Sequence, residues 1–247
     1  MGKIFEALEQ AQREQEKLKK PPVVIVPLHE ESPPQDRELN AEQEEEMLLL
    51  HQNLEALLPN TSKAILFIGA QEGEGTSTLV RDFALVSAVR LKKSVLLLDA
   101  DYRNPTQHRF FRIHPKHTWD EILRNKRTFK KALYRIGDTS LQVFPILPNS
   151  GSLPRTLYSA EKEGFWGELK QKYDLILIDS APVAIAHDGV DLSRIVDGVV
   201  LVLEAEKTRG PAAKSVKDRI VNNGGKILGI VFNKRRYYIP EWMYKRL

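Results

Sequence analysis

The chain has 247 residues and no cysteine, and its 37 basic against 33 acidic side chains give a formal charge of +4. This composition excludes a disulfide scaffold, a cysteine nucleophile and a cysteine-ligated metal site, and the length allows one large domain with or without arms. The longest apolar runs, such as 199–203, fall far below the roughly 18–20 residues that span a bilayer. The N-terminus also lacks the apolar core of a secretory signal, so we expect any membrane role to work from the surface.

An arm of three segments is predicted before the compact part of the chain. Residues 1–19 contain a short amphipathic helix whose apolar stripe consists of Ile4, Phe5, Leu8 and Ala11. This helix could dock on its own domain or a neighbour, or anchor the chain to a partner or membrane. Prolines are dense in 20–40, which predicts an extended linker. Residues 41–58 return to helical spacing, with these residues on one side: Met47, Leu50 and Leu54.

The compact domain is predicted over 60–234, where short runs of Leu and β-branched residues alternate with helical segments. Six runs are strand candidates: 64–68, 94–98, 141–144, 175–178, 198–203 and 227–232. Most are continuously hydrophobic, so both faces of the sheet should be covered. Strands separated by helices predict an α/β fold with a doubly wound, mostly parallel sheet, and ligands bind such sheets at the carboxyl ends of the strands.

A glycine-rich loop follows the first predicted strand of this domain and opens a helix. It contains Gly73, Glu74, Gly75, Thr76, Ser77 and Thr78. Its backbone N–H groups and the helix N-terminus favour a phosphate, and the Ser77 hydroxyl could bind Mg²⁺. The spacing is that of a P-loop nucleotide site, although Thr76 stands where the usual lysine would be. A glycine-rich turn without a ligand is the alternative.

Carboxylates follow two further predicted strands. Asp99 and Asp101 come after one strand and Asp179 after another, and the spacing of two places the first pair on the same side of an extended segment. Three carboxylates at one rim repel one another unless a cation is present. A metal with a nucleoside triphosphate explains this pattern better than structural salt bridges do.

The order of these motifs resembles the bacterial tyrosine kinases of capsule and exopolysaccharide synthesis, over roughly residues 60–234. Further matching segments lie along the chain: Asn104-Pro105, His108, 147–151, 157–159, Asp188, Asn233-Lys234 and, at the N-terminus, 4–8. The resemblance implies a P-loop NTPase-type fold that binds ATP or ADP with Mg²⁺ and autophosphorylates a tyrosine-rich tail. It also implies a cytoplasmic location at the inner face of the plasma membrane, beside a membrane-embedded polysaccharide co-polymerase on a separate chain.

The resemblance also implies roles for single residues. Ser77 and Asp179 correspond to Mg²⁺ ligands, Asp99 to a ligand or the base for the tyrosine hydroxyl, and Asp101 to a further catalytic carboxylate that completes the metal shell. Asn233 corresponds to the adenine contact. The candidate phosphate acceptors are Tyr237, Tyr238 and Tyr244.

The chain departs from the family in the P-loop. Thr76 removes a direct charge partner of the β- and γ-phosphates, and Glu72 and Glu74 are expected to add repulsion. Nucleotide binding can survive this change, whereas fast transfer needs a replacement cation from Arg103, Arg81 or a neighbouring molecule. The chain is therefore predicted to be a weak kinase, and a non-catalytic nucleotide-binding adaptor is the alternative. A partitioning or cargo-positioning ATPase is a third interpretation.

Two further departures concern assembly and the tail. The family's Glu-x-x-Arg-x-x-Arg pattern aligns with Glu45, Leu48 and His51, which argues against ring assembly of the family's kind and leaves a hydrophobic helix contact between copies open. The tail, 235–247, is basic and aromatic and suits a headgroup-level surface, an acidic partner or packing on its own core. No recognition module for nucleic acid accompanies it, and we expect none to bind.

Overall fold

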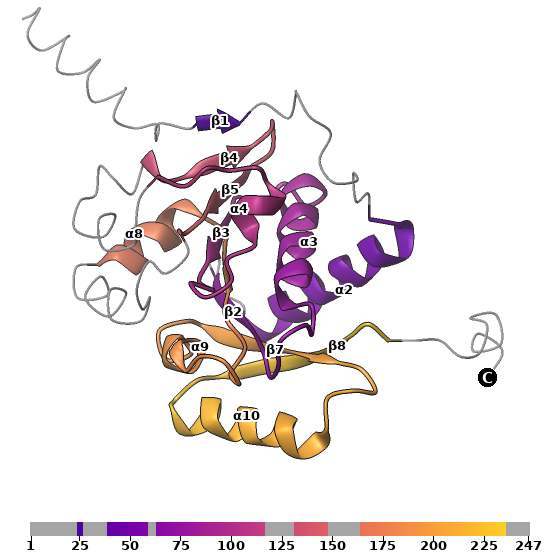
Figure 1. Ribbon diagram of the computed structural model, residues 1–247. Helices are drawn as coiled ribbons and strands as arrows, with labels where there is room; N and C mark the ends of the chain where they lie inside the picture. The colour runs from indigo at the N-terminus through magenta and orange to yellow at the C-terminus, as the bar shows by residue number, and fades with distance from the viewer. Residues whose placement is uncertain (1–23, 27–38, 59–62, 117–130, 148–163, 236–247) are drawn as a thin grey trace, which may run out of the picture.

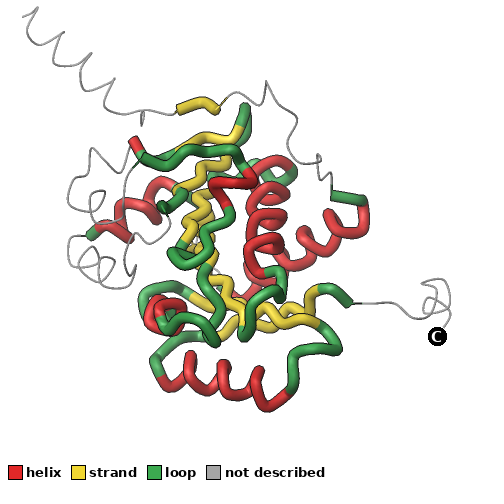
Figure 2. Tube along the Cα trace, in the orientation of Figure 1, coloured by secondary structure: helices red, strands yellow, loops and turns green. Residues whose placement is uncertain are grey.

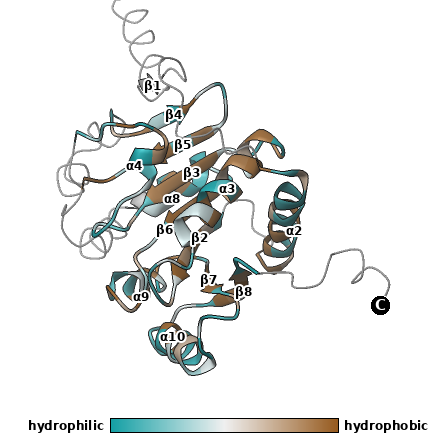
Figure 3. Ribbon diagram, turned by 45° about the vertical axis from the view of Figure 1, so that its right-hand side comes forward, coloured by the Kyte–Doolittle hydropathy of each residue, from teal (hydrophilic) through white to brown (hydrophobic). Residues whose placement is uncertain are grey.

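The computed structural model describes residues 24–26, 39–58, 63–116, 131–147 and 164–235. Eight strands in these ranges form one sheet in the order β1-β4-β5-β3-β6-β2-β7-β8. Figure 1 shows this sheet, and Figure 3 labels β6 within it. The central strands are β2 (Lys63–Gly69), β3 (Val95–Asp99), β6 (Leu175–Asp179) and β7 (Gly198–Glu204). β8 (Ile227–Asn233) closes one side of the sheet, and β5 (Leu141–Phe144), β4 (Tyr134–Ile136) and β1 (Val24–Val26) form the other.

All neighbouring strands run parallel except β4 and β5, which are antiparallel. The predicted mostly parallel α/β sheet is thereby confirmed, and all six strand candidates are strands. Two short strands were not predicted. β1 lies in the range predicted as a linker, at the edge of the sheet, where prolines on either side do not interrupt a ladder.

Helices cover both faces of the sheet, as Figure 2 shows in red around the yellow strands. α2 (Ala41–Leu57) and α3 (Thr76–Val89) contribute to the hydrophobic core of one face. α8 (Phe165–Lys172), α9 (Asp188–Leu192) and α10 (Gly210–Asn222) contribute to the core of the other. The strands supply both cores because alternate side chains point to opposite faces, and the brown hydrophobic residues in Figure 3 concentrate along them.

α2 is held at its start by a capping box, in which Gln43 N donates to Asn40 Oδ1 and Asn40 N donates to Gln43 Oε1. Its buried residues Met47, His51 and Leu54 pack on the core beneath α3, and the His51 ring lies 6.0 Å from that of Phe83. The apolar side of α2, for which a contact between copies was one prediction, is therefore largely covered by the chain itself.

No helix within the described ranges is long and apolar enough to cross a membrane. The predicted helix in 1–19 and the tail tyrosines lie outside the described residues.

Candidate nucleotide and metal site

The glycine-rich loop connects β2 to α3 and depends on two left-handed glycines. Gly73 has φ 84° and Gly75 has φ 86°, a region that side chains other than glycine rarely adopt. Gly75 is constrained twice, because a Cβ atom there would overlap the side-chain amide of Asn233. The loop therefore reaches the helix start at Thr76 along a path that only glycine permits at this position.

A pocket of about 320 Å³ opens over this loop at the carboxyl end of the strands. Residues 71–78 form one wall, and the others include Asp101, Arg103, Ser180 and Lys234. The first turn of α3 has no side-chain cap, so its N–H groups remain available to an anion. The predicted phosphate-binding loop is thus the wall of a pocket of ligand size.

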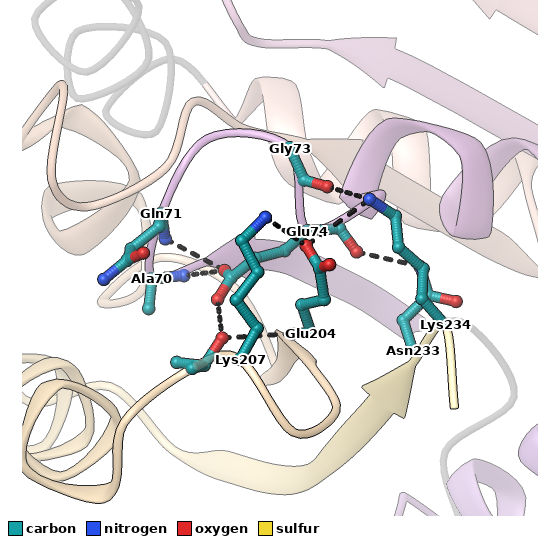
Figure 4. Close-up of polar contacts among 9 residues, drawn as sticks. Ala70, Gln71, Gly73, Glu74, Glu204, Lys207, Asn233 and Lys234 are labelled. Carbon is teal, nitrogen blue, oxygen red and sulfur yellow. Dashed lines mark hydrogen bonds and ion pairs between the residues drawn. The ribbon is translucent and has the colours of Figure 1, made fainter. Parts of the chain in front are cut away.

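The carboxylate of Glu74 is bonded to its own loop and to Thr208 (Figure 4). Its Oε2 accepts hydrogen bonds from Ala70 N at 2.6 Å and Gln71 N at 2.9 Å, and its Oε1 accepts one from Thr208 Oγ1 at 2.5 Å. Only 2% of the residue is exposed. Three donors therefore stabilise the Glu74 charge within the protein, and its repulsion of a phosphate stays a prediction.

The end of β8 holds the loop from the other side. Asn233 Nδ2 donates to the carbonyl oxygen of Glu74 at 2.8 Å, and Lys234 Nζ donates to that of Gly73. Lys234 Nζ also lies 3.4 Å from Glu204 Oε2, which pairs with Lys207 Nζ at 3.0 Å (Figure 4). The amide predicted to contact adenine is thus bonded to the phosphate loop itself, and the adenine role stays a prediction.

The three predicted carboxylates lie at neighbouring strand ends. β3, β6 and β2 are adjacent, and Asp99 is directly opposite Asp179 in the register. Asp99 and Asp179 are fully buried, whereas Asp101 lines the pocket. Asp99 accepts hydrogen bonds from the backbone N–H groups of Asp101, Thr106 and Gln107. Of the two residues predicted to be catalytic, Asp101 is therefore the one that reaches the pocket wall.

Asp179 connects this carboxylate pair to the phosphate loop. Ser77 Oγ donates to Asp179 Oδ1 at 3.1 Å. Burial raises the pKa of Asp179 to about 7, and burial with the nearby Asp179 charge raises the pKa of Asp99 well above its usual range. These two adjacent carboxyl groups resist ionisation on their own, and a divalent cation between them would stabilise their charged forms. No three His, Asp or Glu residues of the described ranges form a complete metal site by themselves.

The two arginines considered as replacements for the missing lysine lie differently. Arg81 is buried, with Nη2 3.3 Å from Thr78 Oγ1 and its guanidinium carbon 3.7 Å from the centre of the Phe110 ring. Arg103 lines the pocket, as Lys234 does. Arg103 and Lys234 are therefore the described cations at the pocket wall.

Comparison with known proteins places this geometry in a family. The tyrosine-protein kinase YwqD of Bacillus subtilis is 30% identical over 204 residues, which cover 81% of this chain and 83% of YwqD. The chain belongs to the bacterial tyrosine-protein kinases. No family model matches the sequence.

Solved structures agree with this kinase fold. The kinase domain of the Escherichia coli tyrosine kinase ETK superposes with a TM-score of 0.69 at 22% identity, covering 79% of this chain and 78% of that domain. The septum site-determining protein MinD of Pyrococcus horikoshii, complexed with Mg-ADP, gives 0.57 at 18% identity, covering 75% and 76%. Both show the P-loop NTPase type of fold that the sequence predicted.

The structure of this kinase family member shows one site residue that the sequence did not reveal, Gln107. Gln107 is fully buried, and its side-chain nitrogen donates to both Ser77 O and Asp179 Oδ2. It follows Thr106 in a segment without hydrophobic periodicity, and only its placement in the fold brings it to the carboxylates. The nearby Asn104 and His108 contributed to the resemblance, but no spacing rule singled out Gln107.

Proposed function

We propose that the chain binds Mg²⁺·ATP in the P-loop pocket and transfers the γ-phosphoryl group slowly to tyrosines of its C-terminal tail. The observation that carries this proposal is the Ser77–Asp179 hydrogen bond. It connects the first turn of α3, directly after the phosphate loop, to the buried pair Asp99 and Asp179. ADP is the product. A membrane-embedded polysaccharide co-polymerase on a separate chain is the proposed partner, and it would keep the kinase at the inner face of the plasma membrane.

The donor set fits Mg²⁺, because the Ser77 hydroxyl and the Asp99 and Asp179 carboxylates are the hard oxygen ligands that this ion prefers. When bound, the ion supplies neutralisation of the charge that develops on the transferring phosphoryl group. The N–H groups of the loop and of the first turn of α3 hold the phosphates. Arg103 and Lys234 are the protein cations that face them.

The transfer step breaks the bond between the γ-phosphorus and the β-γ bridging oxygen and forms a bond to the tyrosine oxygen. The phenol proton passes to a carboxylate, for which Asp101 is favoured by its place in the pocket wall. Transfer is slow because neither wall cation occupies the position of a P-loop lysine. Lys234 Nζ is already bonded to Gly73 O and close to Glu204.

The second candidate function is a non-catalytic nucleotide-binding adaptor. It is supported by Thr76 at the position of the P-loop lysine and by Lys234, which is already bonded to Gly73 O. The two functions are separated by incubating the full chain with γ-labelled ATP and Mg²⁺ and locating the label at Tyr237, Tyr238 or Tyr244. The kinase proposal predicts labelling that Asp99→Asn and Asp101→Asn abolish and that Thr76→Lys increases at least tenfold. Labelling of the wild type no greater than that of Asp99→Asn would overturn the kinase and favour the adaptor.

A further inference from the structure

Gln107 contacts every part of the candidate metal site. It is the first residue of α4 (Gln107–Phe110) and none of its surface is exposed. Its Nε2 donates to Ser77 O at 3.0 Å and to Asp179 Oδ2 at 2.8 Å, and its backbone N donates to Asp99 Oδ2 at 3.0 Å. One residue thus connects the phosphate loop and the ends of β3 and β6.

A carboxamide in this position costs free energy unless its polar atoms find partners. Both side-chain N–H groups have partners, but Oε1 is buried without a hydrogen-bond partner within the described residues. An apolar residue of the same size would avoid that cost. The two donors of this amide are directed at Ser77 O and Asp179 Oδ2, which are both parts of the candidate metal site.

The donors act on the carboxylate that meets Ser77. Asp179 receives Gln107 on Oδ2 and Ser77 Oγ on Oδ1, so the amide fixes the plane of the carboxylate. A fixed Oδ1 in turn directs the Ser77 hydroxyl proton toward itself and leaves the lone pairs of Oγ for a ligand. Residues that orient metal ligands in this way typically change metal affinity by about 10- to 100-fold when removed.

We propose that Gln107 is a positioning residue that orients the Asp179–Ser77 pair for Mg²⁺. This inference rests on the proposed Mg²⁺-dependent nucleotide binding and adds to it a residue that touches neither nucleotide nor phosphate. The effect acts through the side chain, because the backbone N–H of residue 107 to Asp99 survives any substitution except proline. A residue that only fills space would lower stability without altering the response to Mg²⁺.

Gln107→Met tests this distinction, since methionine is unbranched and of similar size but has no N–H donor. Binding of a fluorescent ADP analogue is measured in EDTA and across an Mg²⁺ titration. We expect Gln107→Met to raise the Mg²⁺ concentration for half-maximal enhancement by about 10- to 100-fold. The affinity in EDTA should stay within twofold of the wild type.

Gln142→Met is the control, because Gln142 is also a hydrogen-bonded glutamine but lies in β5 and accepts from Tyr173 away from the site. It should leave the Mg²⁺ response unchanged. If Gln107→Met does not fold, Gln107→Leu also removes both side-chain donors without adding a charge, and it should shift the Mg²⁺ response in the same direction.

The outcomes separate this inference from the proposed function. A wild type whose ADP binding is enhanced by Mg²⁺, together with a folded Gln107→Met of equal Mg²⁺ response, overturns the role of Gln107 alone. A wild type that binds no ADP with or without Mg²⁺ overturns the proposed function and this inference with it.

Discussion

Asp179 changes charge near neutral pH in the metal-free protein, because burial raises its pKa to about 7 from the usual 3.8. The folded state then binds the proton more tightly than the unfolded state does. Its contribution to stability is present below about pH 4 and is lost as the pH rises through about 7. A rise in pKa from 3.8 to about 7 corresponds to at most about 4 kcal/mol of unfolding free energy, of which we expect about half or more to be measurable.

Asp179→Asn should therefore flatten the pH dependence of stability. In EDTA, the free energy of urea unfolding of the wild type should fall between pH 5 and pH 8 by about 1–3 kcal/mol more than that of the variant, because about two of the three pKa units lie in this window. Some slope should remain in the variant, since the pKa of Asp99 is also raised. Equal slopes in the two proteins would contradict a protonated Asp179 in the fold.

At the scale of elements, the backbone conformation of the phosphate loop is stabilised by side chains from other elements. Gly73 and Gly75 have similar φ angles, but a Cβ atom at Gly73 would meet nothing within 4 Å whereas one at Gly75 would meet the Asn233 amide. Gly73→Ala should therefore cost only the left-handed backbone, about 1–2 kcal/mol. Gly75→Ala should cost about 1–3 kcal/mol more, because the overlap adds to the same backbone strain.

The extra cost assigned to Asn233 can be isolated by a double-mutant cycle of urea unfolding. Gly75→Ala should be less destabilising in an Asn233→Ala background than in the wild type, while Gly73→Ala should cost the same in both. A Gly75→Ala cost that Asn233→Ala leaves unchanged would show that the strain lies in the backbone alone.

How far these elements follow from the sequence depends on how local their signals are. The central strands are continuous hydrophobic runs, and parallel strands place Asp99 and Asp179 at one edge, so both were predictable. β4 has three residues with Arg135 exposed between two buried neighbours, and β1 lies among prolines, so neither resembles a strand alone. Glu74 accepts hydrogen bonds from Ala70 N and Gln71 N within its own loop. Its bond from Thr208 and the side-chain contacts of Gln107 are set by tertiary contacts that no spacing encodes.

At the scale of the whole molecule, the two cores are built within one chain, and α2 belongs to one of them. The family position that aligns with the second arginine is His51, which is buried, and burial lowers its pKa. The buried side of α2 already packs on Phe83 and its neighbours, so it cannot bind a second molecule unless α2 first separates from this core. The exposed leucines of α2, Leu49 and Leu57, lie outside that contact.

Leu54→Ala should accordingly destabilise the single chain and not an assembly. We expect a loss of about 2–4 kcal/mol in the free energy of urea unfolding, since a buried leucine is removed from a packed core. Leu49→Ala, at an exposed site of the same helix, should change it by less than about 0.5 kcal/mol. The loss in Leu54→Ala should be the same when the protein concentration is raised about 20-fold, and light scattering should give the same mass as the wild type. A loss that shrinks as concentration rises would instead assign the buried side of α2 to a contact between copies, because only association couples stability to concentration.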